Sequence, residues 1–133
     1  MQGLHLTADL HGCRCAAQWL LDAGALGQAC LDAVRGAGLQ AVGQLFHPFP
    51  ATAHGPGGVT ATVLLAESHL CIHTWPEQRA VTLDVYVCNF GADHSAQAQA
   101  LMDALLALFE PATVQRHALR RGEPAAAGGA FPV

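Results

Sequence analysis

The sequence predicts an α+β fold, a two-layer α/β sandwich in which two helices cover one face of an antiparallel sheet. Two patterns carry this prediction. Apolar and more polar residues alternate over 4–10 and 80–88, as they do in strands with one buried face. Apolar residues recur at helical spacing over 17–34 and 96–108. Strands grouped around two helices favour such a sandwich, and no linker or repeat divides residues 1–122.

The remaining elements follow in chain order. Residues 39–46, 59–66 and 113–120 have the apolar, β-branched character of strands. Residues 70–75 are only partly strand-like, so the expected order is β-α-β-β-β-α-β. Ser95 is the expected N-cap of the second helix.

Two segments are expected to lack regular structure. Residues 48–58 hold three prolines and three glycines, which predicts a loop. Residues 123–133 are rich in Ala, Gly and Pro, and a flexible tail is expected there.

Composition excludes several functional classes. Hydrophobic residues make up 52% and charged residues 12%, with a net charge of −4 and no basic run, so neither disorder nor nucleic-acid binding is indicated. No apolar stretch is long enough to cross a membrane, and residues 1–9 do not resemble a signal peptide. We therefore expect a cytoplasmic protein. The five cysteines are odd in number and irregularly spaced, which argues against a disulfide framework.

The segment 65–77, Leu-Ala-Glu-Ser-His-Leu-Cys-Ile-His-Thr-Trp-Pro-Glu, gathers ionisable residues at the end of an apolar strand. Burying its two glutamates and two histidines without a purpose would be costly. A turn with solvated polar residues explains the same composition equally well.

Three kinds of chemistry can be considered for this segment, and the residue pattern argues against the first two. His69 and His73 are spaced like two metal ligands on a helix, but in a strand they would lie about 13 Å apart, so no metal site is expected. A serine hydrolase would need a G-x-S-x-G turn, which is missing around Ser68. The third is an acyl shift, in which the Ser68 hydroxyl attacks the preceding carbonyl in a strained turn.

Residues 64–77 resemble the processing site of the prokaryotic S-adenosylmethionine decarboxylase proenzymes, which depend on a pyruvoyl group. The Glu-Ser-His and Ile-His-Thr-Trp-Pro-Glu runs are long and chemically unusual. The resemblance spans about residues 4–109 and includes four further segments: 5–13, 46–49, 58–60 and 84–88.

The resemblance implies that the chain cuts itself between Glu67 and Ser68. The products would be a β chain, 1–67, and an α chain, 68–133, that begins with a covalent pyruvoyl group derived from Ser68. In the family this group serves as the electron sink for decarboxylation, as pyridoxal phosphate does elsewhere. Neither metal nor pyridoxal phosphate is expected.

Three further residues match family positions that act on protons. His73 matches the histidine that takes the α-proton during elimination, Thr60 matches a residue that assists processing, and Cys88 matches the cysteine that returns a proton to the decarboxylated carbon. From the sequence alone, each also suits an ordinary role: a hydrogen-bonded core histidine, a strand threonine and a buried apolar thiol.

Three residues match the family's substrate contacts. Phe49 and Trp75 match the aromatic residues that sandwich adenine, and Glu77 matches the carboxylate that accepts hydrogen bonds from the ribose. The expected function is decarboxylation of S-adenosylmethionine for spermidine synthesis, by a homodimer with pockets near its interface. The uncovered sheet face independently suggests burial against a partner.

Some departures from the family pattern leave alternatives open. Nine residues, 50–58, separate Phe49 from Val59, where typical members have fewer, and Gln78-Arg79 follows Glu77. The same pyruvoyl chemistry on arginine or ornithine, or a regulatory paralogue that does not cleave, therefore stays possible.

Overall fold

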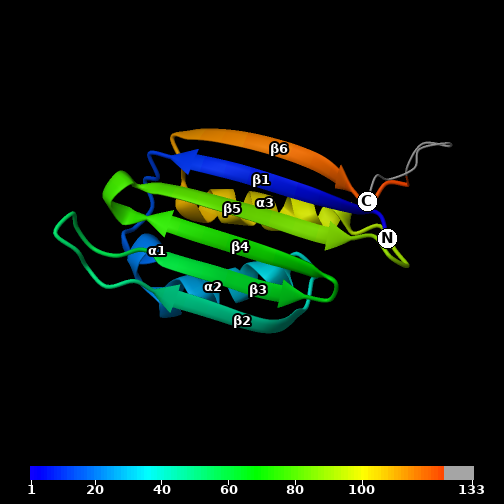
Figure 1. The fold of residues 1–133 in the computed structure, drawn as a ribbon, viewed down its shortest axis with the longest axis horizontal. Coiled ribbons are helices and arrows are strands. Elements are labelled where there is room, and N and C mark those ends of the chain that lie inside the picture. Colours follow the sequence, from blue (N-terminus) through cyan, green and yellow to red (C-terminus); the bar gives the residue numbers. More distant parts are fainter. Residues whose placement is uncertain (125–133) are drawn as a thin grey trace, which may run out of the picture.

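The protein is a six-stranded antiparallel sheet with its helices on one face, as Figure 1 shows for this computed structural model. The structure describes residues 1–124, so nearly all of the predicted tail lies outside the described residues. The strands lie side by side in the order β2-β3-β4-β5-β1-β6. They are β1 Gly3–His11, β2 Ala41–Pro48, β3 Val59–Leu65, β4 Ser68–Trp75, β5 Ala80–Cys88 and β6 Thr113–Arg121. The predicted α+β sandwich is confirmed.

The helices are α1 Gln18–Leu21, α2 Ala23–Gly36 and α3 Ser95–Phe109, with a short 3-10 turn η1 at Pro76–Gln78. The single helix predicted over 17–34 is therefore wrong, because Asp22 breaks it. The Asp22 carboxylate accepts hydrogen bonds from the N–H groups of Gly24 (2.9 Å) and Ala25 (3.1 Å). It thereby caps the start of α2.

Two other predictions need correction. Residues 70–75 belong to a full central strand, since Leu70 of β4 lies opposite both Val63 of β3 and Val85 of β5. Pro76 does not disturb this strand because it falls just after it, where no ladder N–H is needed. Ser95 is not the N-cap of α3 but its first residue, and its N–H donates to the Asp93 carboxylate (2.9 Å).

The two faces of the sheet differ in character. Alternate residues such as Leu6, Leu70 and Val85 are buried against the helices, where Leu101 and Phe109 are fully buried. No helix of residues 1–124 covers the opposite face, as Figure 1 shows. This face carries histidines, threonines and aromatic side chains. Because side chains alternate along a strand, each central strand contributes to both faces. No helix within residues 1–124 has the length and apolar character to cross a membrane.

Candidate active site

The predicted cleavage bond lies in the tight turn between β3 and β4. Leu65 pairs with Ser68, so Ala66 and Glu67 alone form the turn. Glu67 has φ 55°, in the left-handed region that residues other than glycine seldom adopt. Such a conformation costs about 1–2 kcal/mol. The peptide bond that precedes Ser68 therefore follows a strained residue.

Ser68 is held against the end of β5. Its hydroxyl oxygen accepts a hydrogen bond from the backbone N–H of Cys88 (3.1 Å). Nδ1 of His94 donates to the Cys88 carbonyl oxygen (3.0 Å), which ties the start of α3 to the same point. A cavity of about 180 Å³ opens beside Ser68 and is also lined by Ala66 and Gln97. Ser68 and Cys88 thus form one local group.

Thr60 and His73 form a second group. They lie opposite each other on β3 and β4, and the Thr60 hydroxyl is 3.1 Å from His73 Nδ1. A cavity of about 580 Å³ on the open face is lined by both residues and by Phe49, Trp75 and Glu77. The structure therefore brings five of the predicted site residues around one cavity.

These two groups do not meet within one chain. Ser68 and His73 are five residues apart on the same strand, which separates them by about 16 Å. Ser68 is on the side of the helices, whereas His73 is on the open face. His73 cannot act on atoms of residue 68 in its own chain.

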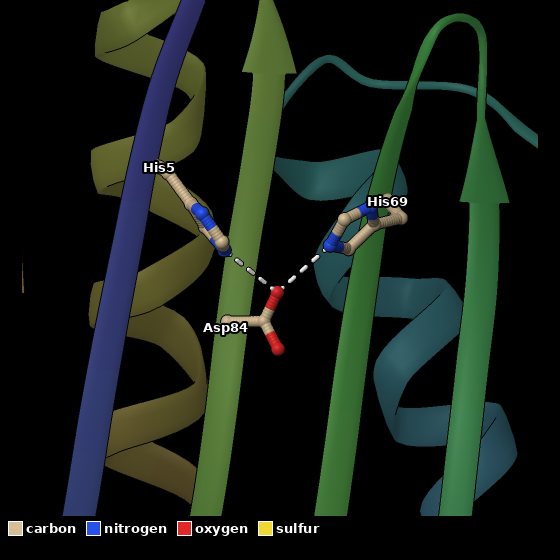
Figure 2. Close-up of side chains that lie close together, drawn as sticks. All are labelled: His5, His69 and Asp84. Atoms are coloured by element: carbon tan, nitrogen blue, oxygen red, sulfur yellow. Dashed lines mark hydrogen bonds and ion pairs between the residues drawn. The ribbon is translucent and has the colours of Figure 1, made fainter. Parts of the chain in front are cut away.

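A third cluster lies between these groups, at the centre of the open face, and Figure 2 shows its geometry. One carboxylate oxygen of Asp84 lies 3.0 Å from Nε2 of His5 and 2.8 Å from Nε2 of His69. The sequence offered one signal for this cluster, an acid in the middle of an otherwise alternating strand, but no role was predicted for His5 or Asp84.

Two histidines and one carboxylate can form a metal-ligand set. Here, however, Arg121 Nη1 lies 2.8 Å from Nδ1 of His5. Because arginine only donates, Nδ1 must accept, and the proton of His5 is on Nε2, directed at Asp84. A metal-bound histidine would instead donate from its second nitrogen. The cluster is therefore a hydrogen-bonded network that joins β1, β4, β5 and β6.

Most of the thiols are packing groups. Burial raises the pKa of Cys30 to about 12 and that of Cys13 to about 11. Burial, with a smaller contribution from the nearby Asp84 carboxylate, also raises the pKa of Cys71. These thiols stay protonated at neutral pH. Cys88 is also buried, at 8% exposure, and its backbone N–H is the group that contacts Ser68.

Arg79, one of the departures from the family pattern, has a structural role. Its Nε donates to the Cys13 carbonyl oxygen (2.6 Å) and its Nη2 donates to that of Cys15. It thereby fixes the turn after β1, and it does not line the large cavity. Gln78 and several residues of the long loop do line it, so these departures do bear on what the cavity holds.

The geometry defines a two-layer α/β sandwich with a cavity on its open sheet face. A crystal structure of the adenosylmethionine decarboxylase from Aquifex aeolicus matches with a TM-score of 0.79 and 30% identity, covering 96% of this chain and 97% of the other.

Sequence comparison agrees with the structural match. The model of the S-adenosylmethionine decarboxylase family matches residues 4–122. A protein of Parasynechococcus marenigrum named S-adenosylmethionine decarboxylase proenzyme is 37% identical over 129 residues, 95% of this chain and 90% of the relative. Its namesake in Aquifex aeolicus is 33% identical over 120 residues, 90% and 81% of the two chains. The chain belongs to the S-adenosylmethionine decarboxylase family, a family of enzymes.

Proposed function

We propose that this chain is a self-processing, pyruvoyl-dependent decarboxylase of S-adenosylmethionine. The observation that carries the proposal is the division of the predicted site residues into two groups. One is a strained turn that holds Ser68 beside Cys88, and the other is a cavity where Thr60 and His73 meet the predicted substrate contacts. Each group has the chemistry that its half of the reaction requires.

In the first step, the Ser68 hydroxyl oxygen attacks the carbonyl carbon of Glu67. The C–N bond breaks, the serine nitrogen becomes a free amine, and an ester joins Glu67 to Ser68 Oγ. A base then removes the α-proton of residue 68, and Glu67 leaves with its new α-carboxylate, so that residue 68 becomes dehydroalanine. This enamine tautomerises to an imine, and hydrolysis replaces its nitrogen by the oxygen of water. Ammonia is released, and a pyruvoyl group stands at the start of the α chain. The left-handed Glu67 favours the first step because opening the turn releases strain.

The separation of the two groups leads us to propose a homodimer with composite sites. A second copy, packed with its open face on the first and its strands reversed in direction, can bring its His73 and Thr60 to the β3–β4 end of the other sheet. Residue 68 begins β4 at that end, and after the cut it is a free chain end that can turn from the helix side toward the open face. Symmetry then creates two equivalent sites, because each copy gives one group to each site. The side chains of this uncovered face, polar and aromatic in turn, suit such an interface.

The chain's own residues have distinct tasks in this site. His73, with Nδ1 held by Thr60, presents Nε2 as the base that removes the α-proton. The Cys88 thiol returns a proton to the substrate carbon after carbon dioxide leaves. The pyruvoyl group, when formed, supplies the electron sink.

The cavity suits a substrate that carries a positive charge and a nucleobase. Phe49 and Trp75 are 50% and 39% exposed, so their ring faces remain free to stack on a nucleobase and to attract a sulfonium. Glu77 supplies a carboxylate that can accept hydrogen bonds from ribose hydroxyls. We propose that the product is the aminopropyl donor of spermidine synthesis.

The proposal is tested by intact mass and by release of carbon dioxide. The purified 13.8-kDa chain is expected to appear as two fragments that separate after Glu67. Carboxyl-labelled S-adenosylmethionine should lose its label, while arginine and ornithine should not. If only arginine or ornithine loses its label, that amino acid is the substrate. If the chain stays uncut, the proposal of a self-processing enzyme fails and a regulatory role is favoured.

Replacing Glu67 by glycine tests the strained turn. Glycine adopts φ 55° at no steric cost, so the Glu67→Gly chain should cut itself about 5-fold more slowly, as loss of about 1 kcal/mol of strain predicts. In an uncut Ser68→Ala background, the same change should raise Tm by about 2–4 °C. Ala66→Gly is the control, because Ala66 does not have a positive φ. Equal rates for wild type and Glu67→Gly would show that strain does not drive the cut.

A further inference from the structure

The loop between β2 and β3 is a defined structure. The Phe49 N–H donates to the Gly58 carbonyl (2.9 Å) and closes its base. Thr52 and Gly55 exchange two backbone hydrogen bonds (2.8 and 3.1 Å) and close its tip. The N–H of His54 donates to the Thr52 hydroxyl (3.2 Å). His54 is therefore held in place by the turn that surrounds it.

This loop forms a wall of the 580 Å³ cavity. A Cβ at Gly55 would lie 3.7 Å from the Cβ of Glu77, an ordinary contact distance, so the loop tip lies beside the glutamate. His54, one residue before, lines the same cavity as Glu77 and Gln78. The extra length of the loop is what brings an imidazole to this place.

The cavity has two ends. Thr60 and His73 mark the end where we place the reaction. The chain then runs outward from His73 past Trp75 into η1, where Glu77 lies. The titratable groups that line the cavity are His73 at the reacting end and His54 and Glu77 at the other. The loop tip that carries His54 therefore lies beside Glu77, away from the end where we place the reaction.

We infer that His54 is a specificity-determining residue that hydrogen-bonds the nucleoside end of the substrate. An imidazole offers one donor and one acceptor, which suits a base edge or a ribose hydroxyl. It lines the same cavity as Glu77, and the two aromatic residues Phe49 and Trp75 line that cavity as well. This inference rests on the proposed function, because it takes the substrate to be adenosyl-containing.

A remote contact is made equally in the ground state and in the transition state. Its loss therefore raises KM and leaves kcat unchanged. For one hydrogen bond, His54→Ala should raise KM for S-adenosylmethionine about 3- to 10-fold. His54→Gln, which keeps a donor and an acceptor, should recover part of that loss.

Methylthioadenosine separates the nucleoside end from the amino-acid end, since it carries only the former. Its inhibition constant should rise in His54→Ala by about the same factor as KM. His11→Ala is the matched control, because His11 is exposed at the end of β1 and does not line the cavity. Cleavage at Ser68 should proceed normally in both variants.

The outcomes separate this inference from the proposed function. If wild type decarboxylates S-adenosylmethionine and His54→Ala leaves both constants within twofold, His54 has no recognition role and the proposed function stands. A fall in kcat with unchanged inhibition by methylthioadenosine would also overturn the inference. If wild type does not act on S-adenosylmethionine, both the proposed function and this inference fail.

Discussion

The Ser68→Ala protein is expected to remain one uncut chain and to release no carbon dioxide from S-adenosylmethionine. Without the hydroxyl, no ester can form and no pyruvoyl group arises, so the electron sink is lost together with the nucleophile. The expected loss of turnover is on the order of 10⁴-fold or more, as for removal of other covalent nucleophiles. Intact mass and label release measure the two effects separately.

Ser95→Ala is the matched control, since Ser95 is the only other serine in the chain. It should cut and turn over as wild type does. Ser68→Cys provides a second arm, because a thiol can attack the same carbonyl, so this variant should still cut, more slowly. Retained cleavage in Ser68→Ala would place the processed bond elsewhere.

Mixing two inactive variants should restore activity if the sites are composite. In a heterodimer of Ser68→Ala with His73→Asn, one site carries both mutations and the other carries neither. Random assortment makes half of the dimers mixed, each with one intact site of two, so co-expression should give about a quarter of wild-type turnover. Each variant alone should be inactive.

The pairing of Ser68→Ala with Cys88→Ala is the control for this experiment. Both residues belong to the same local group, so no mixed dimer contains an intact site. Turnover should stay at the background level. Equal recovery in the two mixtures, or none in the first despite heterodimers on a native gel, would contradict the composite site.

The composite site that we propose would account for the distance between His73 and residue 68 of the same chain. The two residues are close in sequence, and the motif that contains them reads as one site. On a strand, however, five residues span about 16 Å and end on opposite faces. Two residues of one sequence motif, such as Ser68 and His73, can therefore lie far apart in the folded chain.

Residue patterns alone predicted a large part of the fold. Alternation over 80–88 and helical spacing over 96–108 depend on local geometry, and the structure agrees with both. Local patterns predicted secondary structure less reliably where pairing with neighbouring strands determines it. The segment around Leu70 looked only partly strand-like, yet pairing with β3 and β5 on both sides makes it a central strand.

What the sequence by itself determined was the family, through the long run around Glu67 and Ser68, and the alternation that builds the sheet. Tertiary structure alone decided which side chains meet. It joined His5, His69 and Asp84 across three strands, separated Ser68 from His73, and set the loop of His54 beside Glu77. The physical reason is that strand pairing and loop closure bring together residues distant along the chain, and no local pattern encodes those contacts.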